Sequence, residues 1–435
     1  MNATLGIRRE DKNRWERRVP ITPQHVSELK EKYGIETIIQ PSRIRVFSED
    51  DYRKVGAHVQ DSLAPSSVVF AVKEIPLDVF EQGKTYIFFS HTIKGQHHNM
   101  PMLKQMMSMG CTLIDYERIV DATGKRLVFF GRFAGLAGMI DTLWTFGQRL
   151  HWERIETPFS EIKQTIQYKN LEEIKKHFMK IGHMIKTKGL PESISPLIIG
   201  FSGYGNVSTG AQEILDFLPV KDVKPEDLDS VFSHPSATVV YKVVFKEEHM
   251  VEPISPNTPF DLQEYYNHPE RYRAAFERYI PSLSILMNCI FWSDRYPRLL
   301  TKEYMKKVFP MTEKSRLKVI GDVSADINGA VEFTEKTTSP DNPVYVYNPI
   351  SDSIQDGYTG DGVVVMAVDN LPCELPRESS QSFSQTLLQF IPEIMKADFS
   401  VSEFDHIALP PEIKNAVILY QGKLTPNYRY INKFL

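Results

Sequence analysis

The chain has 435 residues, enough for two or three domains, and 42% of them are hydrophobic, as in globular proteins with a full core. The formal net charge is −4, and the lysines and arginines are scattered, which argues against a nucleic-acid or membrane-binding surface. Cys111, Cys289 and Cys373 lie too far apart for a metal motif or a disulfide framework, so we expect a reducing compartment.

No apolar run reaches the length of a membrane span, so we expect no membrane segment. The first residues, MNATLGIRRE, lead directly into a predicted strand, which is not typical of a signal or transit peptide. The chain is either a complete protein or a part cut from a longer polypeptide.

Strand and helix patterns alternate in the first part of the chain. A helix begins after Thr22, an N-cap followed by Pro23 at the first helical position, and runs to Tyr33, where Gly34 ends it. Short apolar or β-branched runs predict strands at residues 4–8, 35–40, 68–72 and 86–90. This alternation indicates βαβ units and a mostly parallel sheet.

A second α/β region follows two long helices, expected at residues 135–152 and 171–188. Its first strand leads through a glycine-rich turn into a helix, and four more strands and a helix follow. The expected strands are residues 197–201, 239–245, 284–292, 318–323 and 362–368, and the expected helices are residues 207–217 and 379–396. The end of the chain is predicted to be rich in loops.

These patterns predict an α/β fold with two Rossmann-like domains, mostly parallel sheets and a cleft between the domains. We expect the last helix to pack back on the first region. The predicted domains are residues 1–140 plus 371–435 and residues 141–370.

The turn after the first strand of the second region reads GYGNVS, close to the G-x-G-x-x-G loop of dinucleotide-binding proteins. Gly203 supplies the tight turn, and Gly205 lets the backbone approach a pyrophosphate at the helix that starts near Asn206 and Val207. Ser208 replaces the third glycine, is small enough for close packing, and offers a hydroxyl to phosphate. The motif predicts nucleotide binding, with a plain strand–helix turn as the alternative.

The acidic residue that usually binds the ribose about 20 positions after such a loop is not evident. Lys224, in LPVKDVKPEDL, stands near that place. A lysine there suits the 2′-phosphate of NADP better than the free hydroxyl of NAD. The sequence therefore predicts NADPH/NADP+ as the cofactor, unless the lysines of this segment belong only to a solvated loop.

Two basic side chains directly follow predicted strands. Lys73 ends SSVVFAVK, and a lysine that loses solvent there has a lowered pKa and can act as an acid or base; alternatively, it snorkels to solvent. His91 follows YIFFS, at a strand end where α/β sheets place ligands, or it is a surface histidine. His97 and His98 lack further spaced ligands, so we predict no metal site.

The remaining charged residues are individually indistinguishable from surface charge. Arg18, in ERRVPITP, has the fork geometry that binds carboxylates, and Glu117, in LIDYERI, could pair with a cationic group. Asp322 and Asp326, in GDVSAD, form the one carboxylate pair of interest. The sequence shows no recognisable Ser–His–Asp or Cys–His arrangement for nucleophilic catalysis.

Taken in chain order, these blocks resemble the alanine dehydrogenase and lysine-forming saccharopine dehydrogenase superfamily. The first part fits through LGIRREDKNRWERRVPITP, FAVKEIP, FFSHTIKGQ, LIDYERIVD and GRFAGLAGMID. More particular blocks are similar to the lysine–ketoglutarate reductase part of bifunctional α-aminoadipic semialdehyde synthases, namely GYGNVSTGAQEI, YYNHPERY, PRLLT, DVSADINGAVEF and VDNLPCELPRESS. The similarity extends from residue 5 to about residue 431. This family resemblance makes the first predicted domain a substrate domain and the second a dinucleotide-binding domain.

The resemblance implies a reaction. L-lysine and 2-oxoglutarate condense, and NADPH reduces the imine to saccharopine, the first step of lysine degradation. By the same resemblance, Lys73 and His91 are the catalytic acid–base pair, Arg18 binds a substrate carboxylate, and Lys94 and Glu117 match other substrate-site positions.

For the cofactor, the resemblance places Asp322, Asp369 and Asn370 near the nicotinamide. The sequence departs from the family near Lys224, where animal relatives carry a glutamate, which weakens the cofactor assignment. The family's saccharopine-oxidising second half is missing, so the chain is a natural single-function enzyme or a domain of a longer bifunctional chain.

Two other functions are open to this sequence. An alanine dehydrogenase-like activity on pyruvate and ammonia is one, although the PRLLT and HPERY blocks argue against it. A non-catalytic nucleotide sensor or scaffold is the other, although it would need neither Lys73 nor His91. A homo-oligomer is possible. By resemblance to animal relatives, we expect the mitochondrial matrix, with the cytoplasm as the alternative.

Overall fold

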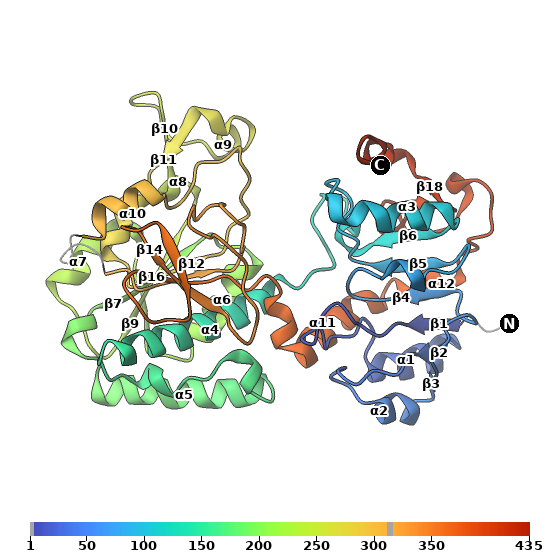
Figure 1. The fold of residues 1–435 in the computed structure, drawn as a ribbon, viewed down its shortest axis with the longest axis horizontal. Helices are drawn as coiled ribbons and strands as arrows, with labels where there is room; N and C mark the ends of the chain where they lie inside the picture. The colour runs from blue at the N-terminus through green and yellow to red at the C-terminus, as the bar shows by residue number, and fades with distance from the viewer. Residues whose placement is uncertain (1–3, 311–315) are drawn as a thin grey trace. The chain divides into compact units, whose positions relative to one another are not determined.

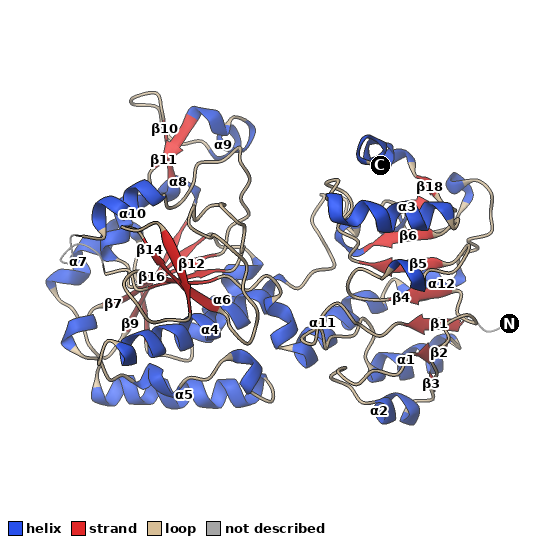
Figure 2. Cartoon of the chain, viewed as in Figure 1, coloured by secondary structure: helices blue, strands red, loops and turns tan. Residues whose placement is uncertain are grey.

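The computed structural model describes residues 4–310 and 316–435, which form two compact units (Figures 1 and 2). Unit 1 comprises the chain up to Phe130 together with Pro376–Leu435, and unit 2 is Gly131–Leu375. The sequence placed these boundaries after residues 140 and 370 instead. The first difference arises because the helix that starts at Gly131 packs along its whole length within unit 2.

Unit 1 contains an eight-stranded sheet in the order β18-β17-β6-β5-β4-β1-β2-β3. Its N-terminal part supplies β1 (Thr4–Ile7), α1 (Pro23–Tyr33), β2 (Glu36–Ile39), α2 (Glu49–Lys54), β3 (His58–Val59), β4 (Val68–Phe70), β5 (Thr85–Phe88), α3 (Met100–Ser108) and β6 (Thr112–Asp115). Its C-terminal part supplies α11 (Pro376–Leu388), α12 (Ile391–Lys396), α13 (Pro411–Lys414), β17 (Val417–Tyr420) and β18 (Lys423–Leu424).

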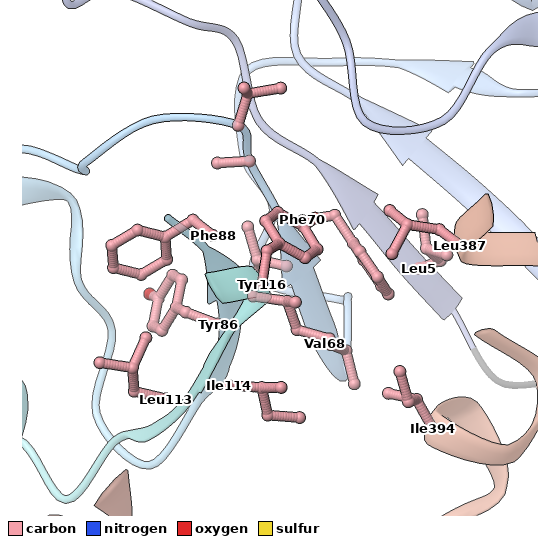
Figure 3. Close-up of a cluster of buried hydrophobic side chains, with 14 of the residues drawn as sticks. Leu5, Val68, Phe70, Tyr86, Phe88, Leu113, Ile114, Tyr116, Leu387 and Ile394 are labelled. Atoms are coloured by element: carbon pink, nitrogen blue, oxygen red, sulfur yellow. The ribbon is translucent and has the colours of Figure 1, made fainter. Parts of the chain in front are cut away.

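The six strands from β6 to β3 pair in parallel, whereas β17 pairs antiparallel with β6. Figure 3 shows the core of this unit, where Val68, Phe70 and Tyr86 of the central strands pack in one cluster with Leu387 of α11 and Ile394 of α12. The central strands are fully buried, as in parallel sheets with both faces covered, so their sequences read as continuous apolar runs.

The C-terminal segment is anchored to the start of α1 by buried hydrogen bonds. The backbone N–H of Val19 donates to the Ser380 hydroxyl and that of Thr22 to the Ser384 hydroxyl, both at 3.0 Å. The Ser384 hydroxyl also bonds His25 Nδ1 at 2.6 Å. The bond from Thr22, the N-cap of α1, satisfies a backbone group that the helix start leaves unpaired, and the whole set joins residues 376–435 to the N-terminal part of unit 1.

Two expectations for this segment were wrong. The helix predicted at residues 379–396 is divided into α11 and α12, because Pro392 has no N–H and its ring clashes with the carbonyl one turn earlier. The loop-rich end contains strands β17 and β18, and β17 completes the sheet beside β6.

Unit 2 contains an eight-stranded sheet in the order β15-β14-β16-β13-β12-β7-β9-β8. Its helices are α4 (Gly131–Trp152), α5 (Leu171–Lys188), α6 (Asn206–Leu215), α7 (Leu228–Ser233), α8 (Glu247–Met250), α9 (Leu262–Asn267) and α10 (Lys302–Val308). Its strands are β7 (Leu197–Ser202), β8 (Val220–Asp222), β9 (Val240–Phe245), β10 (Val251–Pro253), β11 (Tyr272–Ala274), β12 (Ile285–Asn288), β13 (Val319–Asp322), β14 (Val344–Asn348), β15 (Ser353–Asp356) and β16 (Val363–Met366).

The strands from β8 to β16 pair in parallel, and β14 and β15 add an antiparallel edge. Alternate residues of β7 point into different cores, Ile199 with α4, α5 and α6 on one face and Ile198 with Phe276 and Leu283 on the other. The two sheets confirm the α/β fold class with mostly parallel strands. No helix of the described residues is long and apolar enough to cross a membrane.

Helices α4 and α6 approach each other closely through glycines. A Cβ atom on Gly135 would lie 1.9 Å from the carbonyl oxygen of Val207, and one on Gly210 would lie 2.0 Å from the carbonyl oxygen of Arg132. No side chain fits at either position without a backbone shift. The small-residue pattern of α4 is therefore a packing feature, and Gly210 belongs to the helix contact rather than to the turn before α6.

Candidate functional site

Charged residues gather at the carboxyl edge of the unit 1 sheet. Because β1, β4, β5 and β6 are parallel neighbours, the loops that follow them leave the sheet at the same edge. Glu10 follows β1, Lys73 and Glu74 follow β4, His91 follows β5, and Glu117 follows β6. The topology thus brings together residues that lie more than a hundred positions apart in sequence.

His91 is held by the residue that follows Lys73. Its Nδ1 lies 2.6 Å from Glu74 Oε1, and Lys12 Nζ lies 2.9 Å from Glu74 Oε2. A carboxylate only accepts hydrogen bonds, so Nδ1 carries the proton and Nε2 is the nitrogen left for proton exchange. Burial acts to raise the pKa of Glu74, but the bonds and charges of His91 and Lys12 lower it further, well below its usual range.

The backbone at His91 is strained, since its φ is +48°, in the left-handed region that non-glycine residues rarely adopt. Asn99 Nδ2 donates to the carbonyl of His91 at 3.1 Å, and the buried carboxyl of Asp115 accepts the N–H of the preceding residue, Ser90, at 3.0 Å. Burial raises the pKa of Asp115. The turn is therefore fixed from both sides, which sets the direction of the imidazole.

Lys73 is half-buried, and the protein lowers the pKa of its ammonium through loss of solvent and through the nearby charge of Arg18. In the described part of the chain, the Lys73 ammonium makes no ion pair or hydrogen bond. Its backbone N–H and that of Val72 donate to the carboxyl of Glu10, at 3.0 and 2.6 Å. Burial and the charge of Glu16 raise the pKa of Glu10 to about 7.

Arg18, predicted to bind a substrate carboxylate, is buried in a two-pronged ion pair with Glu16. Its Nε and Nη2 donate to the two carboxylate oxygens at 2.7 and 2.5 Å, and its guanidinium lies over the ring of Phe130 at 4.3 Å. Two faces of the guanidinium are thus already engaged by the protein. Its binding to a substrate carboxylate stays a prediction, and in this structure its charge lowers the pKa of Lys73.

The two other substrate-site predictions lie in adjacent loops. Lys94 is exposed three residues beyond His91, and its backbone N–H donates to Gln96 Oε1 at 3.2 Å. Glu117 lies 3.6 Å from Arg126, which is the cationic partner that its sequence pattern allowed. The roles of Lys94 and Glu117 in a substrate site stay predictions.

In unit 2, the glycine turn connects β7 to α6. Gly203 has a φ of +87°, which favours glycine, and a Cβ on Gly205 would meet no protein atom within 4 Å. Gly205 therefore keeps open space above the turn. Asn206 and Val207 begin α6, where the first backbone N–H groups of a helix have no partner within it and favour an anion.

The side chain of Ser208 points into the protein, whereas the sequence predicted that its hydroxyl contacts a phosphate. Its side chain is fully buried, and its hydroxyl accepts a hydrogen bond from Gln212 Nε2 at 3.0 Å. A buried hydroxyl with a partner one turn along the helix serves packing. The expectation that a small residue is needed here therefore agrees with the structure, whereas the hydroxyl is directed into the protein.

The segment with Lys224 lies farther from the glycine turn than the sequence suggested. The strand that follows α6, β8, pairs with β9, and β9 lies between β8 and β7. Two strand spacings amount to about 10 Å. Lys224 is exposed after β8, and the residue that follows the strand next to β7 is Lys246, with Glu247 after it.

A cavity of about 390 Å³ opens beside the glycine turn. Gly203, Gly205 and Glu247 line it together with aromatic side chains, namely Tyr204, Tyr265, Tyr266, Phe291, Trp292 and Tyr296. Flat apolar walls with a few polar groups are typical of sites for small molecules and cofactors. The cavity was not predictable from the sequence, because its walls come from the segments after β7, β9 and β12.

Asp322 lies at the end of β13 and is fully buried in a hydrogen-bond network. Its oxygens accept bonds from Thr334 Oγ1 at 2.6 Å and from Ser324 Oγ and Asn288 Nδ2 at 2.8 Å. Burial raises its pKa despite these donors. Asp322 therefore joins the ends of β12 and β13, and a contact with the nicotinamide stays a prediction.

Asp369 and Asn370 follow β16 at the same edge of the sheet; the first is exposed and the second is buried. Among the described residues, no cluster of His, Cys, Asp or Glu side chains has the geometry to hold a metal ion. The two edges thus contain ionisable groups with shifted pKa values in unit 1 and a glycine turn with a cavity in unit 2.

Comparison with known proteins gives consistent results. The chain matches the N-terminal domain of the alanine dehydrogenase/PNT family over residues 6–137 and its C-terminal domain over residues 220–427. It is 38% identical to the α-aminoadipic semialdehyde synthase of Arabidopsis thaliana and 34% identical to the mitochondrial α-aminoadipic semialdehyde synthase of Mus musculus. Each match covers 99% of this chain, but only 41% of the plant protein and 47% of the mouse protein.

Among solved structures, an L-alanine dehydrogenase is similar over 99% of this chain and 100% of its own, with a TM-score of 0.63 and 17% sequence identity. At that identity the likeness concerns the fold alone. The chain spans less than half the length of the plant and mouse α-aminoadipic semialdehyde synthases.

Proposed function

The chain belongs to the alanine dehydrogenase/PNT family, and we propose that it is a lysine–ketoglutarate reductase, which condenses L-lysine with 2-oxoglutarate and reduces the imine to saccharopine. Two named relatives, the plant and mouse α-aminoadipic semialdehyde synthases, support this reaction class. The observation that carries the proposal is the pairing of His91 with Glu74, the residue directly after Lys73.

The reaction needs groups that exchange protons near neutral pH. The attacking amine of the substrate must be neutral, so a base removes its proton, and the carbinolamine loses water only when an acid donates a proton to its hydroxyl. Lys73 suits this work because its pKa is lowered, which brings its neutral form closer to physiological pH. An unpaired, half-buried ammonium is otherwise unfavourable, which suggests a functional reason for its retention.

His91 is the second proton-transfer group in this proposal. The bond from Nδ1 to Glu74 fixes the tautomer and the ring orientation, which leaves Nε2 to accept or donate a proton. Glu74 is therefore a positioning residue. It was missed by the sequence reading even though it lies in the quoted block FAVKEIP, because a single glutamate beside a lysine carries no signal without its histidine partner.

The substrates explain the surplus of basic groups in these loops. Saccharopine carries three carboxylates, and carboxylates are bound by arginine and lysine side chains. Arg18 and Lys94 are the candidates given by the family resemblance. Since Glu16 already holds Arg18, a substrate carboxylate would have to approach a different edge of the guanidinium.

A nicotinamide dinucleotide is the cofactor of this family, and it would supply the hydride that reduces the imine. The residues of unit 2 fit such a group, because Gly205 leaves space for a pyrophosphate and the N–H groups at Asn206 and Val207 start a helix. NADH and NADPH carry the same hydride, so the reaction type is separate from the choice between them.

The reaction is tested by following absorbance at the reduced nicotinamide band with L-lysine and 2-oxoglutarate, and by identifying saccharopine by mass spectrometry. We expect turnover only when both substrates are present. The matched assay replaces them with pyruvate and ammonium. Turnover with that second pair alone would favour an alanine dehydrogenase-like activity, and no turnover with either pair would favour a non-catalytic protein.

The chain matches only one part of each of the two semialdehyde synthases. Because it matches less than half of each semialdehyde synthase, we infer that it corresponds to the reductase part of those proteins, either alone or within a longer chain. The mouse relative is named as mitochondrial, and a mitochondrial location of this chain stays a prediction. A homo-oligomer also stays a prediction.

A further inference from the structure

The strand order of unit 2 identifies a different residue for the ribose position than the sequence did. In dinucleotide-binding sheets, the acidic residue that binds the ribose hydroxyls lies at the carboxyl end of the strand beside the one that enters the glycine turn. Here that neighbour is β9, which ends at Phe245. Glu247 follows two residues later and lines the same cavity as Gly203 and Gly205.

Glu247 is the only charged residue among those that line this cavity. The lining residues include no lysine, arginine or histidine. Lys246 precedes Glu247 but is exposed outside the lining set, and Lys224 is exposed beyond β8. A cavity whose one charge is negative attracts hydroxyl donors and repels a phosphate group.

Two phenols fix the direction of this carboxylate. Tyr204, inside the glycine turn, donates to Glu247 Oε2 at 3.2 Å, and Tyr266, on α9, donates to Oε1 at 2.6 Å. Burial and the charge of Glu247 raise the pKa of both phenols, so they remain donors. A carboxylate accepts about four hydrogen bonds, so the clamp leaves room for two more, as many as a ribose 2′,3′-diol supplies.

We propose that Glu247 accepts the 2′- and 3′-hydroxyls of the adenosine ribose, held in place by Tyr204 and Tyr266, and thereby makes this protein select NADH over NADPH. The inference rests on the nicotinamide chemistry of the proposed function and replaces NADPH, the cofactor predicted from Lys224. With NADPH, the 2′-phosphate would lie against a carboxylate in a partly desolvated cavity without a cation to neutralise it.

The test is a fluorescence titration of the full chain with NADH and with NADPH, without lysine or 2-oxoglutarate. We expect the Kd for NADPH to exceed that for NADH by about tenfold or more, which corresponds to about 1.4 kcal/mol. The Glu247→Gln variant removes the charge at nearly constant size. It should weaken NADH binding several-fold and tighten NADPH binding, so that the ratio of the two Kd values approaches one.

Glu248→Gln is the matched control, because Glu248 is the next residue on α8 but is exposed and does not line the cavity. It should leave both Kd values unchanged. Equal or tighter binding of NADPH by the unsubstituted chain would overturn the inference, as would an unchanged ratio in Glu247→Gln. The titration contains no substrate, so its outcome does not depend on the activity assay. An absence of turnover with lysine and 2-oxoglutarate would overturn the proposed reaction but not the preference for NADH.

Discussion

The carboxyl edges of the two large sheets differ in how they hold charge. In unit 1 the edge contains several buried or half-buried ionisable groups. Burial and the charge of Glu16 raise the pKa of Glu10, and burial and the charge of Arg18 lower the pKa of Lys73. In unit 2 the cavity beside the glycine turn has aromatic walls and a single charge, that of Glu247. Both edges follow parallel strands of similar sheets.

The difference is consistent with the functions that we propose for the two units, proton transfer in unit 1 and dinucleotide binding in unit 2. Groups that move protons need pKa values displaced by burial and neighbouring charge, and unit 1 supplies these. A dinucleotide needs backbone N–H groups, open space and flat apolar surfaces, and unit 2 supplies those. Under this proposal, two sheets of similar topology serve two kinds of chemistry, and substitutions should separate them.

The largest expected effect is that of Lys73→Met. Removal of an acid–base group costs about 10²–10⁴-fold in rate, so kcat should fall by that range, while the Kd for the reduced dinucleotide changes little. Steady-state kinetics and a fluorescence titration measure the two quantities. If Lys73→Met keeps full activity, unit 1 does not supply the proton-transfer group.

Glu74→Gln should have the next largest effect. The amide cannot hold the His91 imidazole as the carboxylate does, so we expect kcat to fall by about tenfold to hundredfold with little change in dinucleotide binding. Glu74→Asp should restore part of the rate. Glu28→Gln is a suitable control, because Glu28 is a surface residue of α1 paired only with Lys32 among the described residues. Equal losses in the aspartate and glutamine variants would contradict a positioning role.

Two glycines of the second edge should respond in opposite ways. Gly205→Ala meets no protein atom, so the free energy of unfolding should stay nearly constant while dinucleotide binding weakens by about tenfold, because the methyl group fills space meant for the pyrophosphate. Gly210→Ala forces α6 against the carbonyl of Arg132 and should lower the free energy of unfolding by about 1–3 kcal/mol. Urea unfolding and fluorescence titration distinguish them. If Gly205→Ala binds the dinucleotide as tightly as the parent chain, the dinucleotide does not bind at this turn.

The smallest expected effect is the contribution of Glu10 to the pH dependence of the free energy of unfolding. Its pKa rises from 4.5 to about 7 in the folded protein, so the folded state keeps a proton that the unfolded state has lost between these values. Its contribution to stability is therefore full below pH 4.5, declines as the pH rises, and is lost above about 7. Denaturant unfolding should show this decline in the parent chain and a flatter dependence in Glu10→Gln. Parallel pH profiles for the two chains would mean that Glu10 ionises normally.

Much of the local structure could be predicted from the sequence. Thr22, Pro23 and Gly34 mark the ends of α1, and Gly34 has the left-handed conformation that this position requires. Helix α5 has the predicted bounds, because its apolar period and the glycine after it are both clear. The short strands β6 and β17 were missed, since runs of four residues become strands only when a neighbouring strand pairs with them.

The candidate site was predicted in part. Lys73, His91 and the glycine turn were identified because a polar residue after an apolar strand is a local signal. Glu74, Glu10 and Glu247 were not, since their importance depends on partners from other loops. We infer a ribose position other than Lys224, because counting along the chain assumes that β8 lies beside β7, whereas β9 does.

The sequence by itself determined the α/β class, the ends of α1 and α5 and the turn at Gly203, because these follow from neighbouring residues and from periodicity. Only the tertiary structure decided which loops share an edge, how far burial shifts the pKa values of Lys73 and Glu10, and that Glu247 rather than Lys224 lies in the cavity. The physical reason is that burial and charge interactions depend on distances in space, which strand order sets and sequence separation does not.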